Sequence, residues 1–194
     1  MIKTLFLTAL TVAIAVAGGA ASVWVALDTD LAFDTVKIGG WTAHPRRGTS
    51  DADPYARARF SREADLALGI GEGLVFTADH DANGDPLRLS CAYRIEGEMP
   101  AARFWTLHAR LPDGTVVDRP GARPPALHSY ALLREAGSDV ATTISRHPVP
   151  GNWLAVAGSG HFVIRLTLYD TAIASSARVA DIQLPRIRRE DCDD

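Results

Sequence analysis

The feature that most constrains this chain is a charge-free, strongly apolar run that covers residues 4–27. An α-helix needs about 20 apolar residues to cross the hydrocarbon core of a bilayer, and this run is long enough. A single helix can span lipid because it satisfies its own backbone hydrogen bonds. The run therefore predicts one transmembrane helix near the amino terminus.

The charges that flank this run predict its orientation. Lys3 and the terminal amine precede the run, whereas Asp28, Asp30 and Asp34 follow it. The positive-inside rule places the amino terminus in the cytoplasm and the rest of the chain outside. We therefore expect a single-pass inner-membrane protein with a periplasmic C-terminal domain, anchored through residues 4–27, with Trp24 at the outer interface.

A cleaved signal peptide is the alternative interpretation of the same run. Residues 5–17 have the length of a signal-peptide core, and Gly19, Ala20 and Ala21 supply small residues for cleavage. The run continues through residues 23–27 instead of becoming polar, which favours an uncleaved anchor. Both interpretations export the rest of the chain, whereas a buried helix of a soluble core is rarely charge-free for so long.

Length and composition limit the architecture of the chain beyond the anchor. The chain has 194 residues, of which 47% are hydrophobic, so one ordinary domain fits. A net charge of −3 excludes a basic nucleic-acid footprint, and two cysteines exclude a disulfide-dense scaffold. We expect an anchor at 1–27, a linker and lead-in at 28–48, and a β-sandwich domain at 49–194.

The exported part is expected to contain one amphipathic helix followed by strands. Asp51 or Asp53 can cap a helix that begins at Pro54, and Gly69 and Gly71 are expected to end it. Apolar residues then alternate with polar ones, which is the period of a half-buried strand. Such strands are expected at 87–95, 105–111 and 162–169, with shorter ones at 74–78, 127–133, 140–144 and 179–184. Closely spaced strands without helices between them predict an antiparallel β-sandwich or jelly roll.

Short motifs that occur in a fixed order resemble a known bacterial family. They are Gly40-Trp41, residues 51–58, 67–69, 76–78, 81–87, 91–94, 103–107, 152–154 and 162–169. The ordered set resembles the family catalogued as domain of unknown function 1214. The resemblance implies a β-sandwich that is frequently membrane-tethered and has no established activity. It also implies a companion domain of unknown function 1254, fused or separate, for which this chain has no room.

The chain departs from the family pattern at two places, so no catalytic residue is transferred from the resemblance. Ala155 stands where the family usually has proline after Asn-Trp-Leu. His108-Ala109-Arg110 replaces a more aromatic strand end.

Residues 79–85 match the first half of a calcium-binding loop, with oxygen ligands at alternating positions and a glycine at the sixth. The twelfth position needs a bidentate carboxylate, and Ser90 stands there. Asn83-Gly84 between alternating runs is also a hairpin signal. We therefore interpret the segment as a solvated turn and expect no metal.

Motifs for catalysis and cofactors are missing from the sequence. The histidines show no zinc-ligand spacing, Gly158-Ser159-Gly160 lacks a nucleophile elbow, and residues 68–73 follow a helix instead of opening one. We therefore expect no cofactor and a non-enzymatic binding or scaffolding module of the cell envelope. The alternative is an exported enzyme acting on a glycan or small molecule. Its candidate residues lie on or next to strands: His108, Arg110, His161 and Arg165.

Three tryptophans are the candidate ligand-binding residues. Trp41, Trp105 and Trp153 flank turns, where rings stack on sugars or peptides, although filling the core is the favoured interpretation. Expected partners are the inner membrane and a companion envelope protein, with no nucleic acid. The sequence leaves a glycan or small-molecule ligand open.

The two cysteines are predicted to form a disulfide because exported domains meet an oxidising compartment. Cys91 shares the inward face of its strand with Leu89 and Tyr93, whereas Cys192 lies in a polar tail. The alternative is a buried thiol at Cys91 and a loose thiol at Cys192. It gains support from the inward-facing sulfur, because the tail must reach over the sheet to approach it.

Overall fold

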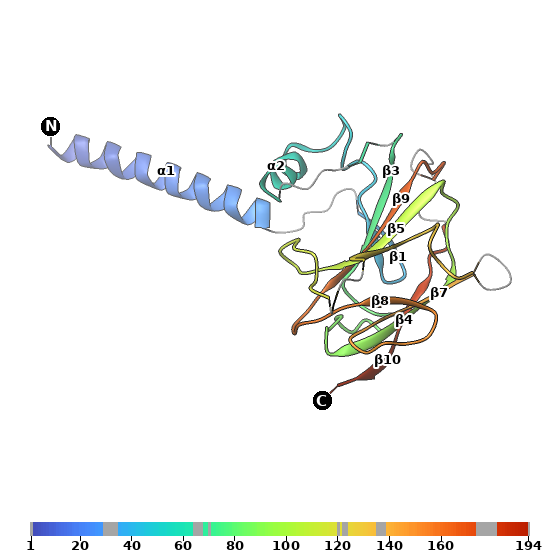
Figure 1. Cartoon of the computed structure of the whole chain (residues 1–194). Coiled ribbons are helices and arrows are strands. Elements are labelled where there is room, and N and C mark those ends of the chain that lie inside the picture. The colour runs from blue at the N-terminus through green and yellow to red at the C-terminus, as the bar shows by residue number, and fades with distance from the viewer. Residues whose placement is uncertain are drawn as a thin grey trace. The chain divides into compact units, whose positions relative to one another are not determined.

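The computed structural model describes residues 2–28, 35–63, 68–69, 71–119, 121, 124–134, 139–173 and 182–193. The chain divides into two compact units. The first unit comprises residues 1–33 and 51–66 and holds the two helices, and the second comprises residues 34–50 and 67–194 and holds the sheets (Figure 1).

The helix α1 spans Ile2–Asp28, and its segment Ile2–Ala26 is long and apolar enough to cross a membrane. None of that window is buried within the protein: the side chains of Leu5 and Phe6, for example, are 76% and 64% exposed. At 1.5 Å per residue the helix is about 40 Å long, which exceeds the thickness of a bilayer's hydrocarbon core. The long apolar helix predicted from the sequence is confirmed.

The helix α2 spans Pro54–Glu63 and begins where the sequence predicts. Asp53 Oδ1 accepts the backbone N–H groups of Tyr55 at 2.9 Å and Ala56 at 3.0 Å, which caps the first turn. The helix ends before the expected Gly69, and residues 64–67 lie outside the described residues. None of the α2 side chains that the structure describes is fully buried.

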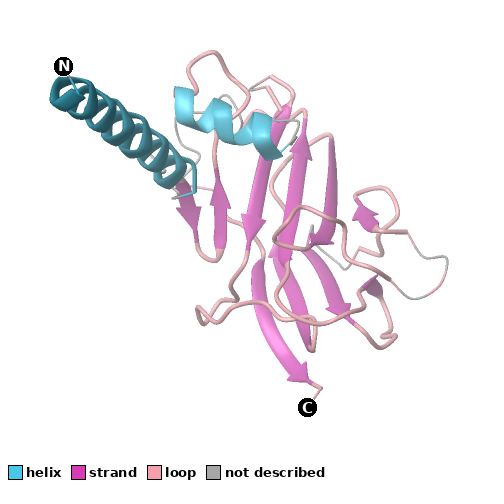
Figure 2. Cartoon of the chain, turned by 90° about the vertical axis from the view of Figure 1, so that its left-hand side faces the viewer, coloured by secondary structure: helices cyan, strands magenta, loops and turns pink. Residues whose placement is uncertain are grey.

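Two sheets form the second unit (Figure 2). The six-stranded sheet is antiparallel throughout, in the order β1-β2-β3-β9-β5-β6. Its strands are β1 (Val36–Ile38), β2 (Trp41–Ala43), β3 (Gly73–Ala78), β9 (Val163–Tyr169), β5 (Phe104–Arg110) and β6 (Ala126–His128). The four-stranded sheet has the order β10-β4-β7-β8. Its strands are β10 (Arg186–Cys192), β4 (Cys91–Glu98), β7 (Asp139–Ser145) and β8 (Asn152–Ala155).

One hydrophobic core lies between these sheets, and alternation along each strand produces it. In β5, Trp105, Leu107 and Ala109 are buried, whereas the intervening residues are half-buried. Both sheets contribute side chains to the same cluster, including Phe76 and Ile164 from one sheet and Ile95, Ile144 and Ile187 from the other. The mostly β, two-sheet fold predicted from the sequence is confirmed.

Several elements differ from the sequence-based expectation. The strands β1 and β2 lie within residues 28–48, which we expected as a linker, and β8 and β10 had no alternating signal. Residues 182–184 form no strand, and residues 179–181 lie outside the described residues. The strand expected at 127–133 ends at His128, where the chain enters a turn.

The pairing of β7 with β8 corrects the expectation of a purely antiparallel fold. The register of Thr142 with Asn152 and of Ser145 with Ala155 is parallel. The connection through residues 146–151 contains two prolines and a glycine, Gly151, at φ 88°. The connection returns the chain toward the start of β7, so β8 runs in the same direction as β7. A hairpin connection would have produced an antiparallel pair.

The polar tail that contains Cys192 forms the edge strand β10, which pairs with β4. Ile187 is buried, so the strand covers part of the core. A register shift at Glu190 adds one residue to β10, and Cys192 rather than Asp191 therefore faces Cys91. The Cα atoms of the two cysteines are 3.8 Å apart, and their sulfurs form the predicted disulfide.

The outward side of this edge carries charged residues, as exposed strand edges commonly do. Arg188 Nη1 lies 2.9 Å from Glu96 Oε1, and Arg94 Nε lies 3.2 Å from Glu96 Oε2. The hydrogen bond from Arg188 is the main cause of a lowered pKa of the Glu96 carboxyl. The Arg188–Glu96 pair adds a polar contact between β10 and β4 to the covalent one, whereas the Arg94–Glu96 pair lies within β4.

Replacing Cys192 with serine tests the contribution of the disulfide to stability. We expect the free energy of unfolding to fall by about 4 kcal/mol, because the bridge closes a loop of roughly one hundred residues in the unfolded chain. Chemical denaturation of the oxidised protein, the reduced protein and Cys192→Ser measures this loss. The reduced protein and Cys192→Ser should lose the same free energy of unfolding relative to the oxidised protein. Thiol labelling of denatured, unreduced protein should detect no free cysteine, and two labelled cysteines per chain would contradict the bridge.

Candidate functional site

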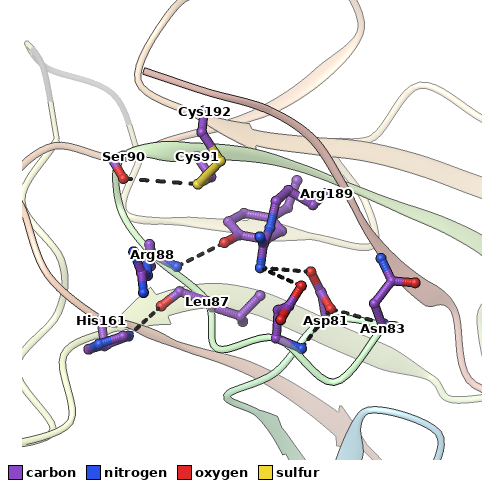
Figure 3. A network of polar contacts seen from close by, with 11 residues as sticks. Asp81, Asn83, Leu87, Arg88, Ser90, Cys91, His161, Arg189 and Cys192 are labelled. Carbon is purple, nitrogen blue, oxygen red and sulfur yellow. Dashed lines mark hydrogen bonds and ion pairs between the residues drawn. A yellow bond between two sulfur atoms is a disulfide. The ribbon is translucent and has the colours of Figure 1, made fainter. Parts of the chain in front are cut away.

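A buried carboxylate organises the turn that follows β3. The Asp81 side chain is 1% exposed, and its Oδ1 accepts the backbone N–H groups of Asn83 at 2.9 Å and Asp85 at 3.0 Å. Asp81 Oδ2 forms an ion pair with Arg189 Nη2 of β10 at 3.1 Å (Figure 3). Ala82 N–H also donates to Ile187 O, so the turn is attached to β10 by backbone and side chain.

The turn at residues 79–85 is solvated as expected except at Asp81, because residues 79, 80 and 82–85 are exposed and the Asp81 side chain is buried. Asp81 points into the protein, where its Oδ1 accepts two backbone hydrogen bonds and its Oδ2 lies in an ion pair with Arg189. The strand β10 supplies the arginine, and the sequence contained no sign of that strand. Among the residues that the structure describes, no group of three or more His, Cys, Asp or Glu side chains is placed to hold a metal ion.

The outward face of the six-stranded sheet brings together three of the four residues proposed for an enzyme. His108 of β5 and Arg165 of β9 are directly opposite each other in the register. Opposed residues in antiparallel strands have Cβ atoms about 5 Å apart. Arg110 lies two residues after His108 and therefore points to the same side. These three half-buried residues form what we call the basic row.

His161 does not belong to the basic row. It forms an isolated bridge with Arg88, and its Nδ1 lies 3.3 Å from Leu87 O (Figure 3). The imidazole is exposed and lies beside the connection that precedes β4. The structure therefore assigns His161 to the same end of the fold as the Asp81 turn.

Four rings lie further along the same face, and we call them the aromatic cluster: Phe104, His128, Tyr130 and Tyr169. The Phe104 ring is central, with centroid distances of 5.9 Å to His128, 5.5 Å to Tyr130 and 5.7 Å to Tyr169. Tyr130 is 75% exposed, and its hydroxyl donates to Arg103 O at 3.3 Å. His128 Nδ1 is buried, and no described residue makes a hydrogen bond to it.

The register connects the aromatic cluster to the basic row. Phe104 is opposite Tyr169, and His108 is opposite Arg165 on the same two strands. Phe104 and His108 are four residues apart, which is about 14 Å along a strand. The two groups therefore form one elongated face of aromatic and basic side chains.

The three candidate tryptophans lie elsewhere. Trp41 and Trp105 are buried in the core, and the Trp41 indole N–H donates to Pro185 O at 2.7 Å. Trp153 is half-buried in β8, and its indole N–H donates to Ser145 O at 3.0 Å. Sequence reasoning missed Phe104, Tyr130 and Tyr169 as surface aromatics. Phe104 and Tyr169 occupy polar-face positions of alternating strands, a signal that was available.

Comparison with known proteins identifies a family but no function. A family model described as "Protein of unknown function (DUF1214)" matches residues 72–173. No curated protein matches the chain.

Two solved structures are similar to this chain. One is the VPA0106 protein from Vibrio parahaemolyticus, at 17% identity and a TM-score of 0.59, with 75% of this chain and 37% of that chain covered. The other is an uncharacterized protein from Burkholderia cenocepacia, at 16% identity and a TM-score of 0.47, with 88% of this chain and 40% of that chain covered. This chain therefore spans about two fifths of the length of each, and the first likeness concerns the fold alone.

Replacing Asp81 with asparagine removes the charge and keeps an oxygen that can accept the turn N–H groups. We expect a loss of about 3 kcal/mol in the free energy of unfolding, because Arg189 loses its buried partner. Asp85→Asn is the matched control: Asp85 is exposed and lies 3.5 Å from the same guanidinium, so we expect a loss below about 1 kcal/mol. Equal losses in chemical denaturation would contradict a special role for Asp81.

Thermal unfolding tests whether the turn binds calcium. Millimolar calcium should leave the melting temperature unchanged, because a ligand raises apparent stability only if it binds the native state. A rise in melting temperature that Asp81→Asn abolishes would show that the turn binds calcium.

Proposed function

This chain belongs to the family "Protein of unknown function (DUF1214)", and we propose that it is an exported, membrane-tethered module that binds a component of the bacterial cell envelope without acting as an enzyme. The single observation that carries the tether is α1, whose apolar segment Ile2–Ala26 contains no buried residue. Burying such a surface in lipid is favourable, since each square ångström of apolar surface removed from water contributes roughly 25 cal/mol. The disulfide supports export, because disulfides persist in oxidising compartments.

The binding surface that we propose is the face formed by the basic row and the aromatic cluster. Tyr130 presents an exposed ring, and a buried polar atom without a partner, such as His128 Nδ1, requires an explanation such as a water molecule or ligand. Arginine recognises anionic groups through several N–H donors at once. The face therefore suits an elongated component that carries both ring-like and anionic groups, such as an acidic glycan.

A companion envelope protein is part of this proposal. The resemblance to the domain of unknown function 1214 family implies such a companion, and in this proposal the companion binds the tethered module.

An exported enzyme is the second candidate, and the pairing of His108 with Arg165 favours it. An imidazole opposite a guanidinium can transfer a proton beside a stabilised negative charge. This candidate predicts that the bound component is chemically changed, whereas the binding module predicts that it is recovered unchanged.

The topology can be tested with a reporter enzyme that is active only in the periplasm. Fused after Asp194, the reporter should be active, and the fusion should stay in the membrane pellet after a carbonate wash, because an apolar helix in lipid resists extraction. Fusion to a cytoplasmic reporter is the control and should be inactive. Activity in the soluble periplasmic fraction would show that α1 is a cleaved signal peptide, and an inactive periplasmic fusion would place the domain in the cytoplasm.

Binding can be tested by capture from detergent-solubilised membranes with the full chain as bait. We expect Tyr130→Ala and Arg165→Gln each to reduce recovery of the bound component by about tenfold or more, as substitutions at central contact residues do. Arg188→Gln, on the outward side of the other sheet, is the matched control and should recover as much as the original chain. Equal recovery by all variants would exclude this face. Mass spectrometry of the component separates binding from catalysis: a product lost in His108→Gln would support the enzyme.

A further inference from the structure

The helix α2 belongs to the same compact unit as α1 and contacts it near the end of the apolar segment. The guanidinium carbon of Arg62 lies 5.2 Å from the centroid of the Trp24 ring, within the range of a cation–π interaction. The Trp24 ring is itself 63% exposed. The last turn of α2 therefore lies beside the C-terminal end of α1.

The composition of α2 does not suit a core helix. Its sequence, PYARARFSRE, contains three arginines and one glutamate. No α2 residue belongs to the hydrophobic core cluster of the sheets. Arg57 and Arg62 are exposed, and Tyr55 is 51% exposed, whereas Phe60 is half-buried. The helix is thus a short basic segment with an exposed aromatic residue.

The position of Trp24 sets the depth at which α2 lies when α1 spans a bilayer. Trp24 is two residues from the end of the apolar segment Ile2–Ala26, and tryptophan rings concentrate at the level of the lipid headgroups. A guanidinium over that ring lies at the level of the lipid phosphates. Arg57 is five residues from Arg62, which is about 7.5 Å along the helix and comparable to the Debye length of ~8 Å at physiological salt.

We propose that α2 binds the anionic phospholipid surface of the membrane that α1 spans, through Arg57 and Arg62, with Tyr55 at the interface. Guanidinium groups form charge-assisted hydrogen bonds with phosphate oxygens, and tyrosine is enriched at membrane–water interfaces. This inference rests on the proposed membrane tether and adds a second, electrostatic contact to it.

The experiment uses the full chain in lipid nanodiscs made of phosphatidylcholine alone or mixed with phosphatidylglycerol. Ser61→Cys places a fluorophore on α2, and the native cysteines are paired in the disulfide. A lipid with a spin-labelled headgroup quenches the fluorophore when α2 lies on the surface. We expect strong quenching in the anionic discs at low salt, and a loss of it near 1 M salt, where the Debye length falls to about 3 Å.

Two double variants decide whether these arginines are responsible. Arg57→Gln with Arg62→Gln should weaken the surface contact by about 25-fold, since each basic residue near an anionic membrane contributes roughly a fivefold factor. Arg103→Gln with Arg186→Gln removes the same charge from the sheet unit and should change nothing. Arg62→Lys keeps the charge and should retain the contact. Circular dichroism and the thiol count check that each variant is folded.

The outcomes separate this inference from the tether on which it rests. A chain that leaves the discs lacks an anchor, and both proposals are then wrong. The α2 inference alone is wrong if the chain stays in the discs but quenching is equal in both lipids and is unaffected by the α2 double variant. Quenching that depends on anionic lipid, salt and the α2 arginines supports it.

Discussion

The pairing of β10 with β4 is the contact on which the second unit depends. It covers one edge of β4, buries Ile187 and brings Arg189 to the carboxylate of Asp81. The carboxylate of Asp81 also stabilises the turn that follows it by accepting hydrogen bonds from two backbone N–H groups. Breaking a buried ion pair leaves an uncompensated charge, which costs about 3–5 kcal/mol. The edge strand, the turn and the core are therefore stabilised together.

Strand geometry explains why one face of the six-stranded sheet fills the core and the other carries the aromatic and basic side chains. Successive side chains alternate between faces, so the residues that fill the core leave every second position for the outward side. On β5 these outward positions carry Phe104, Thr106, His108 and Arg110. The core fixes the strands, and the fixed strands hold an aromatic group and a basic group at a defined separation.

Sequence patterns predict the long strands of this fold well and its short or polar elements poorly. The strands β5 and β9 alternate clearly, whereas β1 and β2 have three residues each and contain too few positions for a period to be detected. The strand β10 has one buried apolar residue, Ile187, and is defined by its partner β4 rather than by its own sequence. The pairing of His108 with Arg165 depends on the register between strands that are distant in sequence, which no single strand encodes.

The disulfide has a consequence for the order of events in the export that we propose for this chain. Cys192 follows Cys91 by 101 residues, and Cys91 begins the strand β4 whose edge β10 later covers. If the residues after α1 cross the membrane in sequence order, as the proposed topology requires, β4 emerges long before its partner, and its edge stays open to other strands. Oxidation can occur only after Cys192 has also emerged. Under the proposed export, the covalent bond therefore forms only when translocation of the domain is nearly complete.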